Sequence, residues 1–421
     1  MAAPCALTQV ARGRPPHVSA RAVGGASAPG RRPVVRAPPP GAALATASPH
    51  PISSGMMRMT TRMLRYARSW VTGRGSASSR EVTIMRDGRP LPATLVTPFR
   101  RRSALPGWIV LHGVTRPGRA HAQLVRFTQA LASTGCAVLV PEVPEWRRLD
   151  LAPGVTAPTV RGSLEALRRR PEVGRGRRGL IGFSFGAPQA LVASADPTIG
   201  PELAGVVGFG GYCDLEETLR FMFLGTHEWR GRRYTLRPDP YGRWIVGANY
   251  LTDVPGYEAH GDVARALWTL AAAAGDHGAP AWDPRYRAMA ERLRQGIAAP
   301  RRPLFDTFVS PSRAEEDRPA LEDLVERLGQ AVRRVDRLMD PADALRRVRH
   351  DVHLLHGRHD HLIPFSETLR TRACLPHAQR VAVTVTRLFG HSAQDPFPGP
   401  IRGLGETLRF LRALGRMLAV A

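Results

Sequence analysis

At 421 residues, the chain is long enough for one large domain with an insertion, or for two domains, and a core of that size needs no disulfide or metal for stability. All 60 basic residues are arginine and the net charge is +25, but no nucleic-acid-binding signature accompanies this charge, so we expect no nucleic-acid partner. No apolar run approaches the roughly 20 residues of a membrane-spanning helix. The four cysteines lack zinc-site spacing, so we expect free thiols, no metal and a cytoplasmic protein.

The first 55 residues are rich in Pro, Ala, Gly and Arg without periodicity, which predicts a disordered tail. This segment resembles an organelle transit peptide, and it also fits a start codon assigned too early in a GC-rich genome, the interpretation that we favour. Residues 56–79 are predicted to form a basic amphipathic helix and a linker. We expect the helix to lie on the domain, with docking to a membrane surface as the alternative. Its apolar stripe consists of Met56, Met59, Met63, Tyr66 and Trp70.

From residue 80 onward, apolar runs alternate with helical patterns. Asp87-Gly88 is a hairpin turn signal between the first two predicted strands. Near-continuous apolar strands separated by helices predict an α/β fold, with a mostly parallel central sheet and helices on both faces. We place Cys136 and Cys213 on strands in its core. The predicted strands are 81–86, 91–97, 108–112, 136–141, 178–183, 203–210, 352–357 and 381–390, and the predicted helices lie near 121–133, 158–170, 187–194 and 404–419.

Residues 215–350 form a segment far longer than a strand crossover requires, so we predict an inserted helical cap between two parts of the core, 80–214 and 351–421. Helical patterns within it include 220–230 and 312–339. Its aromatic residues are candidates for an apolar acyl pocket, although aromatics at such spacing also pack a cap onto a sheet. These residues are Phe221, Phe223, Trp229, Trp244 and Tyr250; Arg230, Arg232 and Arg233 are either contacts for an acidic substrate or solvated.

The stretch Gly182-Phe-Ser-Phe-Gly186 has the spacing G-x-S-x-G between a predicted strand and a predicted helix. A serine hydroxyl becomes a useful nucleophile only when a base takes its proton, a carboxylate orients that base and amide groups bind the oxyanion. Asp360 and His391 each follow one of the last two strands, so the chain order is Ser184, Asp360, His391. Asp214 is a reserve candidate for the acid, with a helix cap as its alternative role.

With these motifs, the sequence resembles the α/β-hydrolase superfamily over about 80–214 and 351–421, a family in which serine, acid and histidine occur in this order. Ser184 stands where relatives that open epoxides or remove halogens have an aspartate. His112-Gly113-Val114 matches the family's H-G-x loop after strand three. The resemblance implies that the backbone N–H groups of Val114 and Phe185 form an oxyanion hole.

The predicted function is that of a serine hydrolase acting on carboxylic esters through an acyl-enzyme, with a small acyl substrate and no cofactor. Ser184 is the nucleophile, His391 the general base and acid, and Asp360 the residue that orients the imidazole. An acyltransferase or a peptidase would use the same residues. A non-catalytic binding protein and a membrane-peripheral lipase remain further alternatives, and the sequence carries no signal for an oligomeric state.

Overall fold

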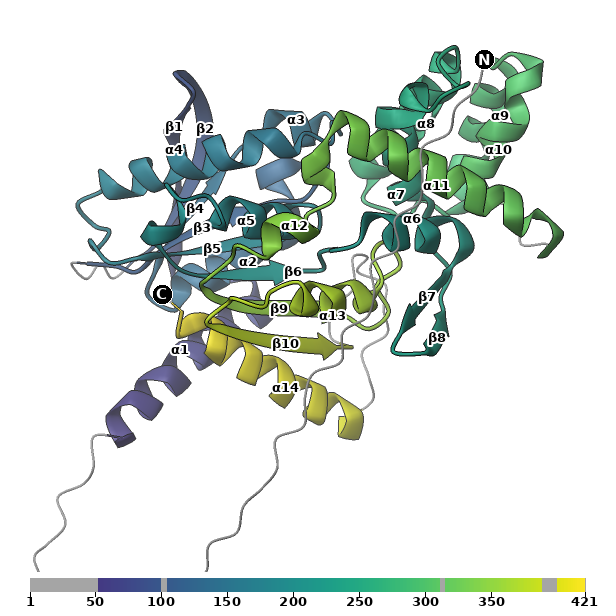
Figure 1. Cartoon of the computed structure of the whole chain (residues 1–421). Helices are drawn as coiled ribbons and strands as arrows, with labels where there is room; N and C mark the ends of the chain where they lie inside the picture. The colour runs from purple at the N-terminus through teal and green to yellow at the C-terminus, as the bar shows by residue number, and fades with distance from the viewer. Residues whose placement is uncertain (1–51, 100–103, 311–314, 388–399, 421) are drawn as a thin grey trace, which may run out of the picture. The chain divides into compact units, whose positions relative to one another are not determined.

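The central sheet has eight strands in the order β1-β2-β4-β3-β5-β6-β9-β10 (Figure 1). β2 is antiparallel to both β1 and β4, and every other neighbouring pair is parallel, which confirms the predicted mostly parallel sheet. The strands are β1 (Ala77–Arg86), β2 (Arg89–Pro98), β3 (Gly107–Leu111), β4 (Ala137–Pro141), β5 (Arg178–Phe183), β6 (Leu203–Phe209), β9 (Asp351–Gly357) and β10 (Arg380–Thr386). The computed structural model describes residues 52–99, 104–310, 315–387 and 400–420.

The β1–β2 hairpin forms at the predicted turn. Asp87 and Gly88 both have positive φ, 49° and 78°, which is the backbone that a two-residue hairpin turn requires. Arg86 therefore pairs directly with Arg89.

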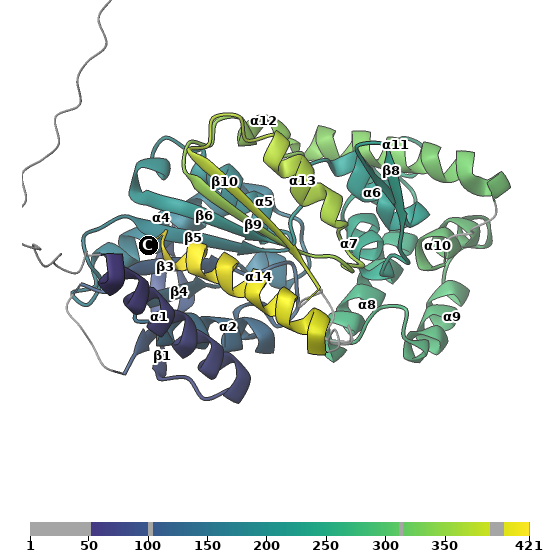
Figure 2. The same ribbon diagram turned by 90° about the horizontal axis from the view of Figure 1, so that it is seen from below.

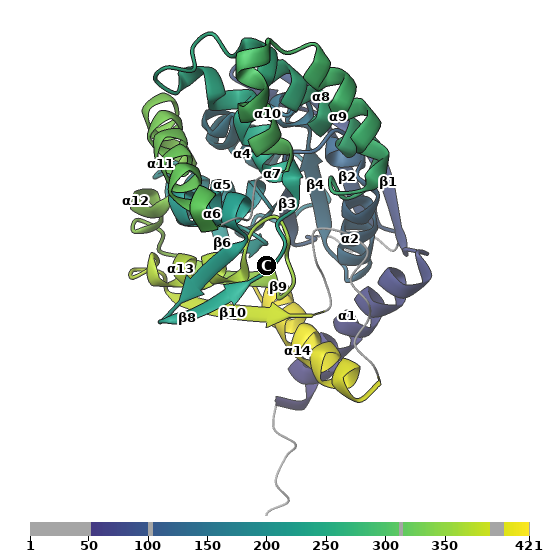
Figure 3. The same cartoon turned by 90° about the vertical axis from the view of Figure 1, so that its right-hand side faces the viewer.

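Helices cover both faces of the sheet, because successive residues of its central strands point to opposite sides. Trp108 and Val110 of β3 belong to the apolar cluster beneath α1, α2 and α14, whereas Ile109 and Leu111 belong to the cluster beneath α4 and α5. Figures 2 and 3 show α1 and α14 on one side of the sheet and α5 and α13 on the other. The helices outside the insert are α1 (Ile52–Thr72), α2 (Ala122–Ser133), α3 (Pro144–Arg147), α4 (Thr156–Arg168), α5 (Gly186–Ser194), α13 (Phe365–Ala373) and α14 (Pro400–Leu418).

Helix α1 begins at Ile52, earlier than the predicted start, whereas residues 1–51 of the predicted tail lie outside the described residues. Its apolar stripe packs on the domain: Tyr66 is buried and its ring meets Phe127 edge-on. The opposite side exposes the apolar side chains of Met57, Leu64 and Val71. None of the described helices is both long enough and apolar enough to cross a membrane.

We call residues 215–350 the insert. The sequence prediction was wrong at 226–229, which is not helical: Gly225 adopts φ 69° and ends α6, and a turn at Arg230-Gly231 then folds the chain into a two-stranded hairpin. The elements of the insert are α6 (Leu215–Leu224), β7 (Thr226–Trp229), β8 (Arg232–Thr235), α7 (Pro240–Tyr250), α8 (Gly261–His277), α9 (Arg287–Gln295), α10 (Arg302–Val309), α11 (Arg318–Val335) and α12 (Ala342–Leu345).

One buried arginine holds three helices of the insert together. The Arg243 guanidinium, on α7, donates to the carbonyls of Phe308 (2.5 Å), Met222 (2.9 Å) and Val309 (3.1 Å), at the ends of α10 and α6. Carbonyl groups at helix C-termini carry partial negative charge, and a fixed cation is a favourable partner for them.

We expect Arg243→Ala to lower the free energy of unfolding by about 3 kcal/mol, because it removes a buried donor from three carbonyls, although that of Phe308 keeps another donor, the Trp244 indole N–H (3.1 Å). Urea denaturation followed by circular dichroism measures this loss. The control is Arg233→Ala, on an exposed arginine of β8, which should leave the free energy of unfolding nearly unchanged. Equal effects of the two substitutions would show that the three contacts contribute nothing.

Candidate functional site

Ser184 lies in a strained turn between β5 and α5. Its φ is +51°, a left-handed conformation that costs a non-glycine residue about 1–2 kcal/mol. Two backbone hydrogen bonds hold the turn: Ser184 N–H donates to the carbonyl of Phe209 (2.7 Å), and Ala187 N–H donates to the carbonyl of Ser184 (2.9 Å). The turn therefore presents a half-buried serine at the carboxyl edge of the sheet.

The glycines of the motif are required by close backbone approach. A Cβ atom at Gly182 would lie 2.0 Å from the carbonyl oxygen of Gly186, and one at Gly186 would lie 2.6 Å from the carbonyl oxygen of His112. A Cβ at Gly113 would lie 3.1 Å from the Cβ of Ser184. The turn between β5 and α5 and the loop after β3, about 70 residues apart in the sequence, thus meet at the serine with no room for intervening side chains.

The two predicted oxyanion donors come from this contact region. Phe185 is the N-cap residue of α5, so its N–H group lies at the positive end of that helix. Its ring packs edge-on against Trp146, which also packs against the ring of His112. Val114 is buried in the loop after β3. The ring of Trp146 thus links Phe185 to His112, the residue that begins the loop after β3.

A buried charge cluster supports the loop after β3. Nδ1 of His112 donates to the carbonyl of Gly113 (2.7 Å), and its Nε2 lies 3.4 Å from the carboxylate of Glu142. Arg119 and Arg147 approach the same carboxylate to 3.2 and 3.6 Å. Burial acts to raise the pKa of Glu142, but the contact with His112 and the charges of the two arginines outweigh it and lower that pKa.

Asp360 lies in the loop after β9 and is buried. One carboxylate oxygen, Oδ1, accepts hydrogen bonds from the backbone N–H groups of Leu362 (2.9 Å) and Ile363 (3.0 Å). The other, Oδ2, lies 3.4 Å from Nε2 of His356, a fully buried residue of β9. The imidazole of His356 is itself held by the Ile363 carbonyl (2.9 Å) and the Thr368 hydroxyl (2.6 Å). The carboxylate of Asp360 is therefore fixed in orientation.

Of the two remaining candidate residues, His391 and Asp214, the structure describes only Asp214. His391 lies outside the described residues. The strand before it, β10, ends beside the loop that carries Asp360 (residues 358–364, here called the acid loop): Arg358 N–H donates to the carbonyl of Thr386 (2.7 Å). The carboxylate of Asp214 accepts a hydrogen bond from the N–H of Glu217 (3.0 Å) at the start of α6. This contact is the helix cap named as its alternative role.

The insert contacts the loops that follow three strands of the core. The Tyr241 hydroxyl is 3.5 Å from the Val114 carbonyl, beyond β3. After β4, the Asn249 side chain donates to the carbonyl of Leu149 (2.9 Å) and accepts from a neighbouring backbone amide. After β9, Asp239 N–H donates to the carbonyl of His361 (2.7 Å). The insert therefore borders the edge of the sheet where Ser184 lies.

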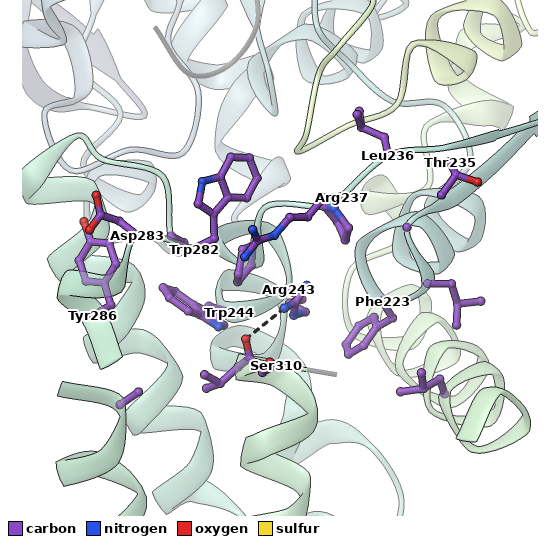
Figure 4. A pocket seen from close by; sticks show the side chains of 18 of the residues that line it. Phe223, Thr235, Leu236, Arg237, Arg243, Trp244, Trp282, Asp283, Tyr286 and Ser310 are labelled. Atoms are coloured by element: carbon purple, nitrogen blue, oxygen red, sulfur yellow. Dashed lines mark hydrogen bonds between the residues drawn. The ribbon is translucent and has the colours of Figure 1, made fainter. Parts of the chain in front are cut away.

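A cavity of about 420 Å³ lies within the insert (Figure 4). Its wall meets the acid loop, since Trp282 packs edge-on against His361, the neighbour of Asp360. The Arg237 guanidinium lies over the Trp282 ring, 5.2 Å from its centroid. The Tyr286 hydroxyl is buried and has no hydrogen-bond partner in the part of the chain that the structure describes. Such a lining suits a ligand that is largely apolar and has a polar group.

The aromatic residues predicted for a pocket lie in three different places. Phe223 and Trp244 line the cavity, whereas Phe221 and Tyr250 are buried in the packing of the insert. Trp229 lies on the hairpin with Arg230 over its ring. Arg232 and Arg233 are exposed on β8, as the solvated interpretation predicts.

Sequence reasoning missed His356, Trp146 and Tyr241. His356 stands inside an apolar strand pattern, where histidine carries no signal of its own, and only its spacing of four residues before Asp360 hints at a contact. Trp146 and Tyr241 act through contacts between distant segments, which no local pattern records. No group of three or more potential metal ligands occurs among the described residues.

No protein-family model and no curated protein matches the sequence. Solved structures with a similar fold include an acylaminoacyl peptidase from Pyrococcus horikoshii (12% identity, TM-score 0.45, 83% of this chain and 43% of that one). Another is Est1E from Butyrivibrio proteoclasticus (12% identity, TM-score 0.41, 80% of this chain and 99% of that one). A third is the Pyrococcus furiosus esterase Pf2001 (12% identity, TM-score 0.42, 82% of this chain and 93% of that one). The chain thus spans less than half the length of the peptidase. Similarities of this size carry no information on chemistry.

The fold follows from the molecule itself. A mostly parallel sheet is covered on both faces, a strained serine turn with two obligatory glycines joins β5 to α5, and the loop after β3 meets that serine. An acidic residue follows β9, later in the chain. This combination is characteristic of one architecture, with the serine at the top of its sheet. The chain therefore has the α/β-hydrolase fold.

Proposed function

We propose that this protein is a serine hydrolase that cleaves carboxylic esters through an acyl-enzyme intermediate. The observation that carries the proposal is the conformation of Ser184, a positive-φ serine in close contact with Gly113. Backbone strain of this kind persists only where the surroundings impose it, and it is concentrated at functional sites.

In the proposed mechanism, the Ser184 hydroxyl attacks the acyl carbon and gives its proton to His391. The backbone N–H groups of Val114 and Phe185 stabilise the oxyanion of the tetrahedral intermediate. His391 then protonates the leaving alcohol, and water activated by the same imidazole releases the acid. Asp360 keeps the imidazole in its productive tautomer. A carboxylate whose orientation is held by two backbone N–H groups is suited to that role.

We expect Ser184→Ala to lose labelling by a fluorophosphonate probe and to lower turnover of p-nitrophenyl esters about 10⁶-fold, because it removes the nucleophile. Intact-mass spectrometry measures the adduct and spectrophotometry the turnover. The control is Ser79→Ala, on an exposed serine of β1, which should behave as wild type. Undiminished labelling of Ser184→Ala would refute the assignment of the nucleophile.

The two candidate acids are distinguished by a matched pair of substitutions. We expect Asp360→Asn to lower turnover about 10⁴-fold, because the imidazole loses its orienting carboxylate. In contrast, Asp214→Ala should preserve turnover and cost about 1 kcal/mol of stability, the usual effect of removing a helix cap. Steady-state kinetics and urea denaturation on both variants provide the measurements. The reverse pattern would transfer the acid role to Asp214.

We further propose that the cavity of the insert receives the part of the substrate remote from the ester bond. An apolar group would pack between Trp244 and Phe223, and a polar atom of the substrate would pair with the unpartnered Tyr286 hydroxyl. Arg237, which stacks on Trp282, would favour a substrate with an anionic group.

We expect Tyr286→Phe to raise KM about 5-fold for long or bulky esters, the effect of one hydrogen bond worth about 1 kcal/mol, and to leave kcat unchanged. Acetyl esters, which lack the long or bulky group, should show no change. The control is Tyr257→Phe, at a tyrosine outside the cavity lining. An equal effect on short and long esters, or no effect on either, would contradict this placement.

The acyltransferase and peptidase alternatives use the same proposed residues. An acyltransferase differs in the nucleophile that attacks the acyl-enzyme, and a peptidase differs in the substrate bond that is cleaved. A panel of ester, amide and thioester substrates, with and without added alcohol or amine acceptors, distinguishes them. Release of free acid from the ester alone supports the hydrolase assignment, whereas acyl transfer that needs the acceptor supports the transferase.

A further inference from the structure

Two cysteines that the proposed mechanism does not use lie in direct contact. The Sγ atoms of Cys213 and Cys374 are 3.0 Å apart, although 161 positions separate the residues in sequence. We call these two residues the cysteine pair. Cys213 follows β6 in the loop that leads into the insert, not on a strand as the sequence suggested, and Cys374 is the C-cap residue of α13.

The surrounding contacts hold the two backbones together without a covalent bond. The buried carboxylate of Glu367, on α13, accepts hydrogen bonds from the N–H groups of Cys213 (3.1 Å) and Asp214 (2.8 Å). Arg370 of the same helix pairs with Glu217 of α6 at 2.7 Å. Because the scaffold already fixes the approach of the two sulfur atoms, closing a bond between them needs only a small side-chain movement.

The two thiols differ in access and in acidity. Cys374 is partly exposed, whereas Cys213 is buried. A hydrogen bond from the Cys213 thiol, together with the charge of Arg346, lowers the pKa of Cys374 to about 7, although partial burial opposes this. The same contact raises the pKa of Cys213. This asymmetry suits an accessible thiolate that reacts first and a buried thiol that resolves the product.

We propose that the cysteine pair is a reversible redox modification site, closed to a disulfide by hydrogen peroxide. The Cys374 thiol first loses its proton to solvent. Its thiolate then attacks the peroxide, so that an S–O bond forms, the O–O bond breaks and the leaving hydroxide takes up a proton from solvent, giving a sulfenic acid and water. The Cys213 sulfur then attacks the Cys374 sulfur, forming the S–S bond and expelling hydroxide, which takes up the Cys213 proton. In total, two thiols are oxidised and one peroxide is reduced to two waters.

The disulfide would join the loop between β6 and α6, which leads into the insert, to the end of α13. The cross-link spans 161 residues of the chain, and a loop of that size restricts the unfolded state strongly. We expect the melting temperature of the oxidised protein to exceed that of the reduced protein by about 5 °C and to return after treatment with dithiothreitol.

The test uses the full-length reduced protein exposed to a small excess of hydrogen peroxide, followed by alkylation under denaturing conditions and peptide mass spectrometry. We expect a Cys213–Cys374 cross-linked peptide. In Cys213→Ser, dimedone should trap a sulfenic acid on Cys374, whereas Cys374→Ser should show neither the cross-link nor the rise in melting temperature. These readouts do not depend on ester turnover, so they can fail or succeed independently of the proposed function.

A matched control is Cys136→Ser. Cys136 is buried, and burial raises its pKa to about 11, so it should remain a free thiol and its replacement should leave the cross-link unchanged. Iodoacetamide should alkylate Cys374 in the Cys213→Ser variant. In the wild-type protein, the rate of Cys374 alkylation should rise with pH around 7, where the thiolate forms. Absence of the cross-linked peptide, or first oxidation at Cys136, would overturn the proposal.

Discussion

The rest of the site depends on one steric constraint, the close approach of three backbone segments at Ser184. The strand that carries the serine, the helix that follows it and the loop after β3 come so near to one another that a single Cβ at Gly182 or Gly186 would overlap a carbonyl oxygen. Since only glycine fits at these positions, the turn is forced into the conformation that raises the serine above the sheet edge.

Around this point, polar groups are fixed in pairs and networks within the core. Glu142 lies between His112 and two arginines below the loop after β3, and Asp360 lies between two backbone amides and His356 after β9. A buried carboxylate without such partners would be strongly destabilising. The networks therefore do two things at once: they keep the acidic groups in the interior, and they fix the loops at the edge of the sheet.

The insert is connected to these loops by its own side chains and backbone. Tyr241, Asn249 and Asp239 lie in or next to α7, and each contacts a different loop of the core. Arg243, on the same helix, ties α7 to the ends of α6 and α10. A shift of α7 would consequently move its contacts with both the loop after β3 and the acid loop. It would also change the shape of the cavity, because α7 forms part of the cavity wall.

The sequence by itself determined the α/β class, the strand positions, the hairpin at Asp87-Gly88 and the serine turn, because each depends on residues that are neighbours in the chain. It did not reveal the hairpin at 226–235, where the left-handed Gly225 ends an apparently helical pattern. Only the tertiary structure decided the contact of the two cysteines, the Arg243 network and the contact of Tyr241 with the loop after β3. These contacts join residues up to 161 positions apart, and no local periodicity or propensity encodes which distant surfaces meet.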